Sequence, residues 1–166
     1  MLKIDANTKY DEFVVFEPYM AEGERERLEQ TAVAAVFGSD GFMNMTVGQM
    51  LDAMRGDFSS LLRSNGESVF DVYRARAFAS FITGSIKRLK AVTLQPTAED
   101  IAVKQGTLNS TFEESVYTFC RSYFQLPTFA AVDDLKVADY LLAKRDDFNR
   151  SVVERNITNR MKGGKK

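Results

Sequence analysis

Residues 110–126 read STFEESVYTFCRSYFQL, the most apolar helical pattern in the sequence. Spacings of 4, 3, 4 and 3 residues place one set of its apolar side chains on a single face of an α-helix: Phe112, Val116, Phe119, Tyr123 and Leu126. Three more side chains widen that face: Tyr117, Cys120 and Phe124. A helix this apolar is normally buried among other helices, so the pattern predicts a helical bundle organised around this segment.

The ends of this helix also have signals. Ser110 and Glu113 fit an S-x-x-E capping box, which predicts the start, and Pro127 prevents the helix from continuing. Within the helix we expect Phe112, Phe119 and Tyr123 to be core anchors. The single cysteine, Cys120, lies on the same buried helix and is predicted to be a core residue, not a nucleophile.

Apolar residues at helical spacing recur along the rest of the chain, with capping or stop signals at their ends. They predict further helices over residues 23–38, 46–62, 68–90, 97–106 and from 133 or 134 to about 160. Residues 10–17 fit a short strand or a first helical turn equally well. The predicted fold is all-α, a single-domain bundle of five or six helices over residues 1–157. Residues 158–166 offer one apolar side chain, Met161, and are predicted to be a flexible basic tail.

Two of these predicted helices share an internal similarity. Residues 46–58 (TVGQMLDAMRGDF) align without a gap with residues 136–148 (KVADYLLAKRDDF), with identities at Val, Leu, Ala, Arg, Asp and Phe. One interpretation is a duplicated helix. The other, which we prefer because the match stops at both ends, is that amphipathic helices with similar starts look alike.

The sequence lacks residues that several classes of protein need for their function. The chain has no histidine, which removes the commonest general base, and one cysteine without histidine offers no zinc ligand set. Phosphate-binding glycine motifs and the G-x-S-x-G motif are absent from the sequence. No apolar run approaches the ~20 residues of a membrane helix, and the start lacks the pattern of a secretory signal. The prediction is a protein that is not an enzyme, with no cofactor, no metal and no membrane partner.

Charge is distributed unevenly along the chain. The net charge is −1, but residues 1–40 hold four basic and nine acidic residues, a net −5, and residues 144–166 hold eight basic and three acidic residues, a net +5. Such asymmetry predicts an interaction tail or head-to-tail self-association, with two merely solvated ends as the alternative. The candidate interaction residues are the basic side chains near the C-terminus: Arg145, Arg150, Arg155, Arg160, Lys162, Lys165 and Lys166.

The four arginines of this set recur every five residues. Each step turns a helix by about 140°, so the arginines encircle it and do not line one face. No aromatic residue follows Phe148 to stack on bases. Non-specific phosphate binding therefore stays open, whereas sequence-specific readout has no support.

Residues 138–146 (ADYLLAKRD), followed by Asn159-Arg160 and the final Lys165-Lys166, carry a family resemblance. They resemble the C-terminal helix of small helical tail-assembly proteins of tailed phages, and residues 46–49 (TVGQ) are similar to a helix opening in such proteins. The match covers about a quarter of the chain, which departs from the pattern in lacking tryptophan and in its aromatic central helix.

The resemblance implies a non-enzymatic accessory of phage or virus assembly, as a tail or connector assembly chaperone or a minor virion protein. Its partners would be other virion or assembly proteins, or further copies in a homo-oligomer. It would be found in the host cytoplasm during assembly or in the virion. The alternative function is a nucleic-acid-associated helical protein that binds phosphate non-specifically through its basic C-terminus.

Overall fold

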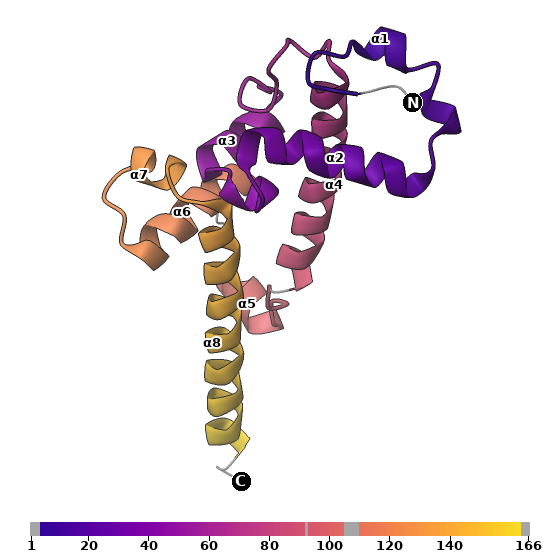
Figure 1. Ribbon diagram of the computed structural model, residues 1–166. Coiled ribbons are helices and arrows are strands. Elements are labelled where there is room, and N and C mark those ends of the chain that lie inside the picture. Colours follow the sequence, from indigo (N-terminus) through magenta and orange to yellow (C-terminus); the bar gives the residue numbers. More distant parts are fainter. Residues whose placement is uncertain (1–3, 92, 105–109, 164–166) are drawn as a thin grey trace.

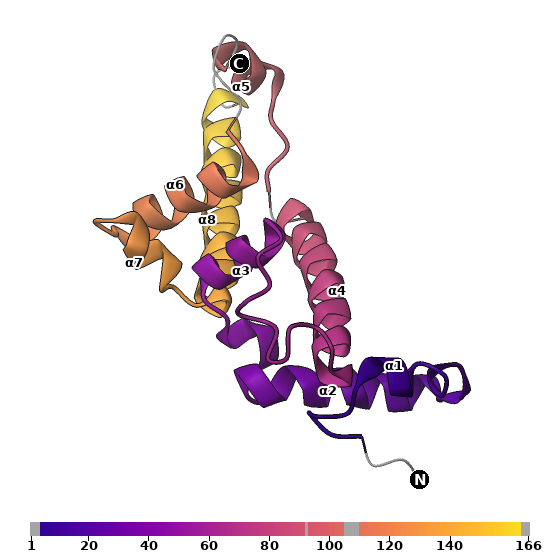
Figure 2. The same cartoon turned by 90° about the horizontal axis from the view of Figure 1, so that it is seen from above.

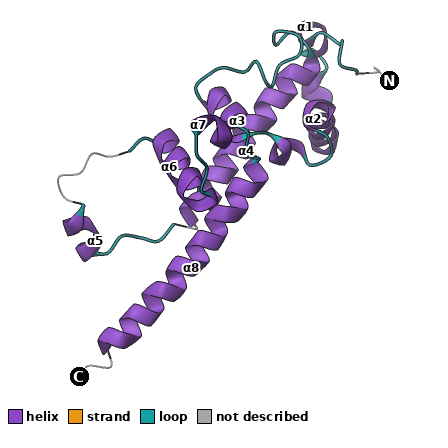
Figure 3. Ribbon diagram, turned by 90° about the vertical axis from the view of Figure 1, so that its left-hand side faces the viewer, coloured by secondary structure: helices purple, strands orange, loops and turns teal. Residues whose placement is uncertain are grey.

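The chain folds into helices, as the sequence predicts, and the longest described connection between them, residues 55–68, joins α3 to α4 (Figure 1). The computed structural model describes residues 4–91, 93–104 and 110–163. This part of the chain is a single all-α domain with no strand (Figure 3). Its helices follow in the order α1 (Tyr10–Phe13), η1 (Glu17–Tyr19, 3₁₀), α2 (Glu22–Phe37), η2 (Gly41–Asn44, 3₁₀), α3 (Val47–Met54), α4 (Val69–Ala91), α5 (Ala98–Val103), α6 (Phe112–Phe124), α7 (Phe129–Asp133) and α8 (Val137–Gly163).

Several predicted helix ends are confirmed. α2 stops before Gly38, whose φ of 77° lies in the left-handed region that favours glycine. The Thr46–Gln49 box caps α3, with the Gln49 amide donating to Thr46 Oγ1 at 3.2 Å. Thr97 caps α5 in the same way. Residues 10–17, which fitted a strand or a helical turn equally well in the sequence, form a single helical turn, α1, and no strand.

The start of α6 differs from the prediction by one residue. Thr111, not Ser110, is the N-cap, and its Oγ1 accepts from the Glu114 amide at 3.1 Å. Phe112 thus becomes the first residue of the helix and is 41% exposed, so its prediction as a core anchor was wrong. The buried residues of α6, Val116 and Cys120, lie farther along the helix.

α3 is shorter than the predicted helix over residues 46–62. It ends at Met54, and Gly56 takes a φ of 100°, which no right-handed helix allows. The following residues form turns, so the second half of that prediction was wrong. Leu61 is still fully buried, because the loop folds back onto the core, while Phe58 lies on the surface.

The last helix starts later and ends later than predicted. A short helix that the sequence did not indicate, α7, occupies residues 129–133, and α8 begins only at Val137. α8 then continues to Gly163, past the predicted start of the tail at residue 158. Lys165 and Lys166 lie outside the described residues. The division into a folded domain over 1–157 and a tail over 158–166 stays a prediction.

Two apolar clusters hold the helices together. The larger joins η2, α3, α4, α6, α7 and the start of α8, around fully buried residues such as Met45, Leu61 and Cys120. The smaller lies at the N-terminal end and packs α1 and α2 on the beginning of α4, around Phe13, Leu28, Ala32, Val69, Phe70 and Tyr73. The molecule is elongated, with the N-terminal segment at one end and the end of α8 at the other (Figure 2).

Helix starts pair with one another through isolated antiparallel bridges. Thr46 faces Lys136, the Val47 amide donates to Leu135 O at 2.7 Å, and the Val137 amide donates to Met45 O at 2.9 Å. These two exchanged bonds join the first residues of the two similar segments, 46–58 and 136–148. The internal similarity therefore marks two equivalent helix starts that are direct partners in space.

Candidate interaction surfaces

The second half of α8 projects from the body of the molecule (Figures 1 and 3). We call residues 150–163 the arm. Val153, Ile157 and Met161 follow each other at spacings of four residues and are each more than half exposed. Residues four apart lie on one side of a helix, so these three form a continuous apolar stripe that nothing in the described chain covers.

The predicted basic residues that the structure describes, Arg145, Arg150, Arg155, Arg160 and Lys162, lie around α8, as their spacing indicates, and do not converge on one site. Arg150 pairs with Asp147 and stacks over the Tyr123 ring, and its pKa is raised mainly by the Asp147 bond. Arg160 makes no hydrogen bond or ion pair with the residues that the structure describes.

The other two basic residues of the arm face α5. Arg155 donates to Gln95 O at 3.0 Å and to Asp100 Oδ2 at 3.4 Å. Lys162 Nζ lies 3.4 Å from Glu99 Oε2. These exposed pairs hold α5 beside the arm and add little stability individually.

An apolar groove opens at the opposite, N-terminal end, with a volume of about 510 Å³. We call it the groove. Its apolar lining comes from Ile4, Phe13, Phe16, Met20, Leu28 and Phe70, and its rim from Glu24, Arg27 and Thr31. Beside it, Val15 and Tyr19 are strongly exposed, Tyr19 at 88%. Exposed apolar side chains next to an apolar hollow are typical of an interaction surface.

A polar cluster fixes one wall of the groove. The Glu17 carboxylate of η1 accepts from Tyr10 Oη at 2.6 Å and from Tyr73 Oη at 2.9 Å, and it pairs with Arg76. Burial raises the pKa of Glu17, but these bonds outweigh it and the pKa lies below its usual value. Burial and the Glu17 bond raise the pKa of Tyr73 to about 12. The cluster ties η1 to α4, so the groove is a formed feature of the fold.

A second apolar pocket, of about 440 Å³, lies between the end of α4 and the start of α8. Met43, Leu89, Leu141 and Leu142 are among its lining residues, together with two arginines, Arg88 and Arg145. Arg145, one of the predicted interaction residues, therefore lies beside an apolar hollow.

The structure places the single cysteine, Cys120, in the core. Cys120 is fully buried, and burial raises its pKa to about 11, which leaves almost no thiolate at neutral pH. Residues 4–91, 93–104 and 110–163 contain no group of three metal-ligating side chains. In the same ranges no helix combines the length and apolarity needed to cross a bilayer.

Comparisons with known proteins found no match among family models, proteins of curated function or solved structures. The resemblance of the C-terminal quarter to phage tail-assembly proteins stays a prediction.

The groove was not predicted from the sequence, although one signal was present. Residues 13–16 (FVVF) form an apolar run at the end of the turn α1, between Glu12 and Glu17. A run in a segment without clear helical spacing gives no indication of which side chains will be exposed.

Proposed function

We propose that the protein is a non-enzymatic interaction component of phage or virus assembly, a tail or connector assembly chaperone or a minor virion protein. The observation that supports this most is the arm, whose exposed apolar stripe is flanked by basic side chains. A long helix with an uncovered apolar face gains stability when a partner covers it. The resemblance of its C-terminal quarter points to virion assembly as the setting, in the host cytoplasm or the virion.

The charge layout supports binding to a protein partner. The arm belongs to a segment of net charge +5, and the groove to a segment of net charge −5, at opposite ends of the molecule. Opposed charged surfaces raise association rates and select partners. The affinity of a protein for nucleic acid comes mainly from contacts to phosphates. A helix that carries basic and apolar residues together on its surface is better suited to binding a protein.

The test is affinity capture with tagged full-length protein in cells that produce the phage or virus. We expect tail or other virion proteins to be retained by the parent, and to be lost with Ile157→Gln in the stripe. Ile101→Gln is the matched control, because it is the same change at an isoleucine outside the stripe and the pockets, exposed to a similar extent, 60% against 53%. Capture with no virion protein among the retained chains would contradict the proposal.

A salt titration against duplex DNA separates the alternative function. Binding through phosphate contacts weakens steeply as salt increases. DNA binding that disappears when residues 158–166 are removed, combined with no virion partner, would favour the nucleic-acid-associated alternative. We expect no such binding at physiological salt.

A further inference from the structure

We infer that the arm of one copy binds in the groove of a second copy, so that copies of this chain join head to tail. This inference rests on the proposed function in assembly, and it names one partner of the arm: the acidic, N-terminal end of another copy. Three observations support it: both surfaces are apolar, the segments that carry them have opposite net charges, and the two surfaces lie far apart in one molecule.

The stripe and the groove are both apolar surfaces. Val153, Ile157 and Met161 span about 12 Å along the arm, because each residue rises 1.5 Å. A row of apolar side chains at i, i+4 and i+8 is the usual way in which a helix binds an apolar groove. The groove volume, about 510 Å³, lies within the range of roughly 300–1,000 Å³ typical of binding pockets. Phe16 and Met20 on its wall and Phe70 in its lining offer apolar contacts to such a row.

The charges around the two surfaces are opposite. Arg150 and Arg160 flank the stripe, whereas the groove is formed mostly by the segment 1–40, whose nine acidic and four basic residues give a net charge of −5. The charged residues that line the groove itself are Glu24 and Arg27, so the difference in charge belongs to the segment around it. The same charges argue against pairing of two arms, since their basic residues would face each other. We therefore expect the arm of one copy to bind the groove of another copy more strongly than it binds a second arm.

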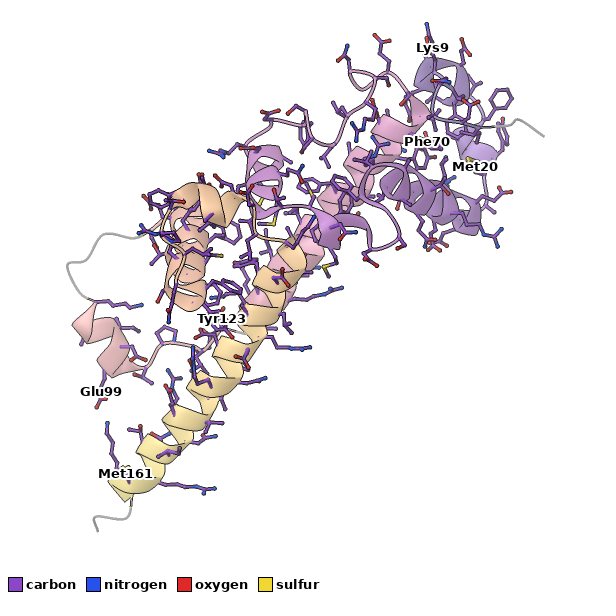
Figure 4. The ribbon with its side chains drawn as sticks, turned by 60° about the vertical axis from the view of Figure 1, so that its left-hand side comes forward. Lys9, Met20, Phe70, Glu99, Tyr123 and Met161 are labelled. Atoms are coloured by element: carbon purple, nitrogen blue, oxygen red, sulfur yellow. The ribbon has the colours of Figure 1, made fainter. Side chains whose placement is uncertain are left out.

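The two surfaces cannot meet within one molecule. Met161 on the stripe lies at one end of the molecule, and Met20 and Phe70 at the groove lie at the other (Figure 4). Both surfaces are exposed in the single chain, so each is available to a neighbour. A contact between two different surfaces is heterologous, and repeated copies of it form a ring or an open filament.

Sedimentation velocity and light scattering of the full-length protein provide the first measurement. A contact of one short helix in a groove is small, so association is expected to be weak, and concentrations up to about 0.5 mM are needed. We expect the average mass to increase with concentration at low salt and to fall towards the monomer at about 0.5 M salt, where charges are screened within roughly 5 Å. A monomer at every concentration and salt would overturn the inference.

Mixing variants then tests that the two surfaces bind each other. Ile157→Gln damages the stripe, Phe16→Gln damages the groove, and both residues are about half exposed, so folding is expected to be kept. Each variant alone should associate at least about tenfold more weakly. An equal mixture should form dimers and nothing larger, because one intact groove and one intact arm remain per pair.

Other outcomes distinguish the competing arrangements. Loss of association with Ile157→Gln but no recovery in the mixture would mean that arms pair with arms, and it would overturn the inference. Association that survives Phe16→Gln unchanged would do the same. If Phe16→Gln fails to fold by circular dichroism, Tyr19→Gln, beside the groove and 88% exposed, replaces it. None of these measurements uses a virion protein, so their failure is independent of the proposed role in assembly.

Discussion

Asp71–Arg74 in α4 and Asp147–Arg150 in α8 are the same pair of residue types at the same spacing, on the two longest helices. The donor–acceptor distances are nearly equal, 2.8 Å and 2.9 Å. The side chains of the α4 pair are 0% and 2% exposed, whereas those of the α8 pair are 35% and 58% exposed. In α4 the pair lies in the core and stabilises it, whereas in α8 the pair lies on the surface and is exposed to solvent.

The buried pair has a complete set of partners. Asp71 accepts from the amides of Arg63, Ser64 and Gly66 at 2.9, 2.7 and 3.2 Å, and from the Ser64 hydroxyl at 2.8 Å. Arg74 also donates to the carbonyl of Ala32 in α2 and to that of Leu61. The pair therefore connects α4, α2 and the loop after α3. Within the described part of the chain, Asp147 and Arg150 bond to each other, and Arg150 contacts another helix only by stacking over the Tyr123 ring of α6.

Replacing Asp71 with alanine should have the largest effect. The change leaves the Arg74 charge buried without its carboxylate and frees three loop amides, which costs about 3–5 kcal/mol in the free energy of unfolding. The matched change, Asp147→Ala, should leave stability within experimental error, because solvent replaces the lost bond. Urea unfolding of both variants measures the difference. Equal losses would show that burial does not distinguish the two pairs.

The sequence indicated the helices but not this difference between them. The spacing of apolar residues predicted α2, α4, α6 and α8, since a helix needs only a local pattern. Asp71 and Arg74 look like a solvated pair in the sequence. Their burial depends on the loop at residues 63–66 and on α2, which are brought there by tertiary packing. The groove could not be predicted for the same reason. That the basic residues of the arm are distributed around α8 follows from helical spacing alone, and their role in binding stays a prediction.

Replacing Phe119 with alanine should have the next largest effect. Phe119 packs against Tyr123 and edge-on against Tyr140, and Lys144 Nζ lies 4.1 Å from its ring centre. Full burial would give a cost of roughly 3–5 kcal/mol, but Phe119 is only partly buried, so we expect about 2–3 kcal/mol. Phe112→Ala, at the exposed start of the same helix, is the control and should cost less than about 1 kcal/mol. Thermal unfolding ranks the two, and a larger loss for Phe112 would contradict the placement of α6.

Acid should destabilise the α4 end through Asp71. Burial alone would raise the pKa of Asp71, but the loop amides and the Ser64 hydroxyl outweigh it and hold the pKa below its usual value. A group with a lowered folded-state pKa stabilises the fold above the unfolded value, about 3.9, and the contribution is lost as the pH falls towards the folded value. Stability should therefore decrease below about pH 4, more steeply in the parent than in Asp71→Asn.

Urea unfolding at several pH values between 3 and 6 checks this prediction. Equal slopes for the parent and Asp71→Asn would contradict it. If Asp71→Asn does not fold, the carboxyl carbon of Asp71 in the parent can be titrated by NMR. A midpoint at or above the usual value for aspartate would contradict it equally.

Removing residues 158–166 should have the smallest effect on stability and the largest effect on association. The last turn of α8 contacts the rest of the described chain through Lys162 and Glu99, 3.4 Å apart and both well exposed. Met161, the one apolar side chain removed, is 70% exposed, so its loss transfers almost no buried surface to water. The unfolding midpoint of the truncated protein should equal that of the parent.

The self-association of the truncated protein should weaken, because Met161 and two bases of the arm are gone. Glu99→Gln separates the two causes, since it breaks the Lys162 pair and leaves the stripe intact. If the truncated protein unfolds at a clearly lower temperature, the last residues of α8, up to Gly163, make contacts that stabilise the fold. The arm would then be part of the stable fold. If stability is unchanged and association is lost, the two longest helices differ in purpose: α4 holds the fold together, and the end of α8 is kept exposed for a partner.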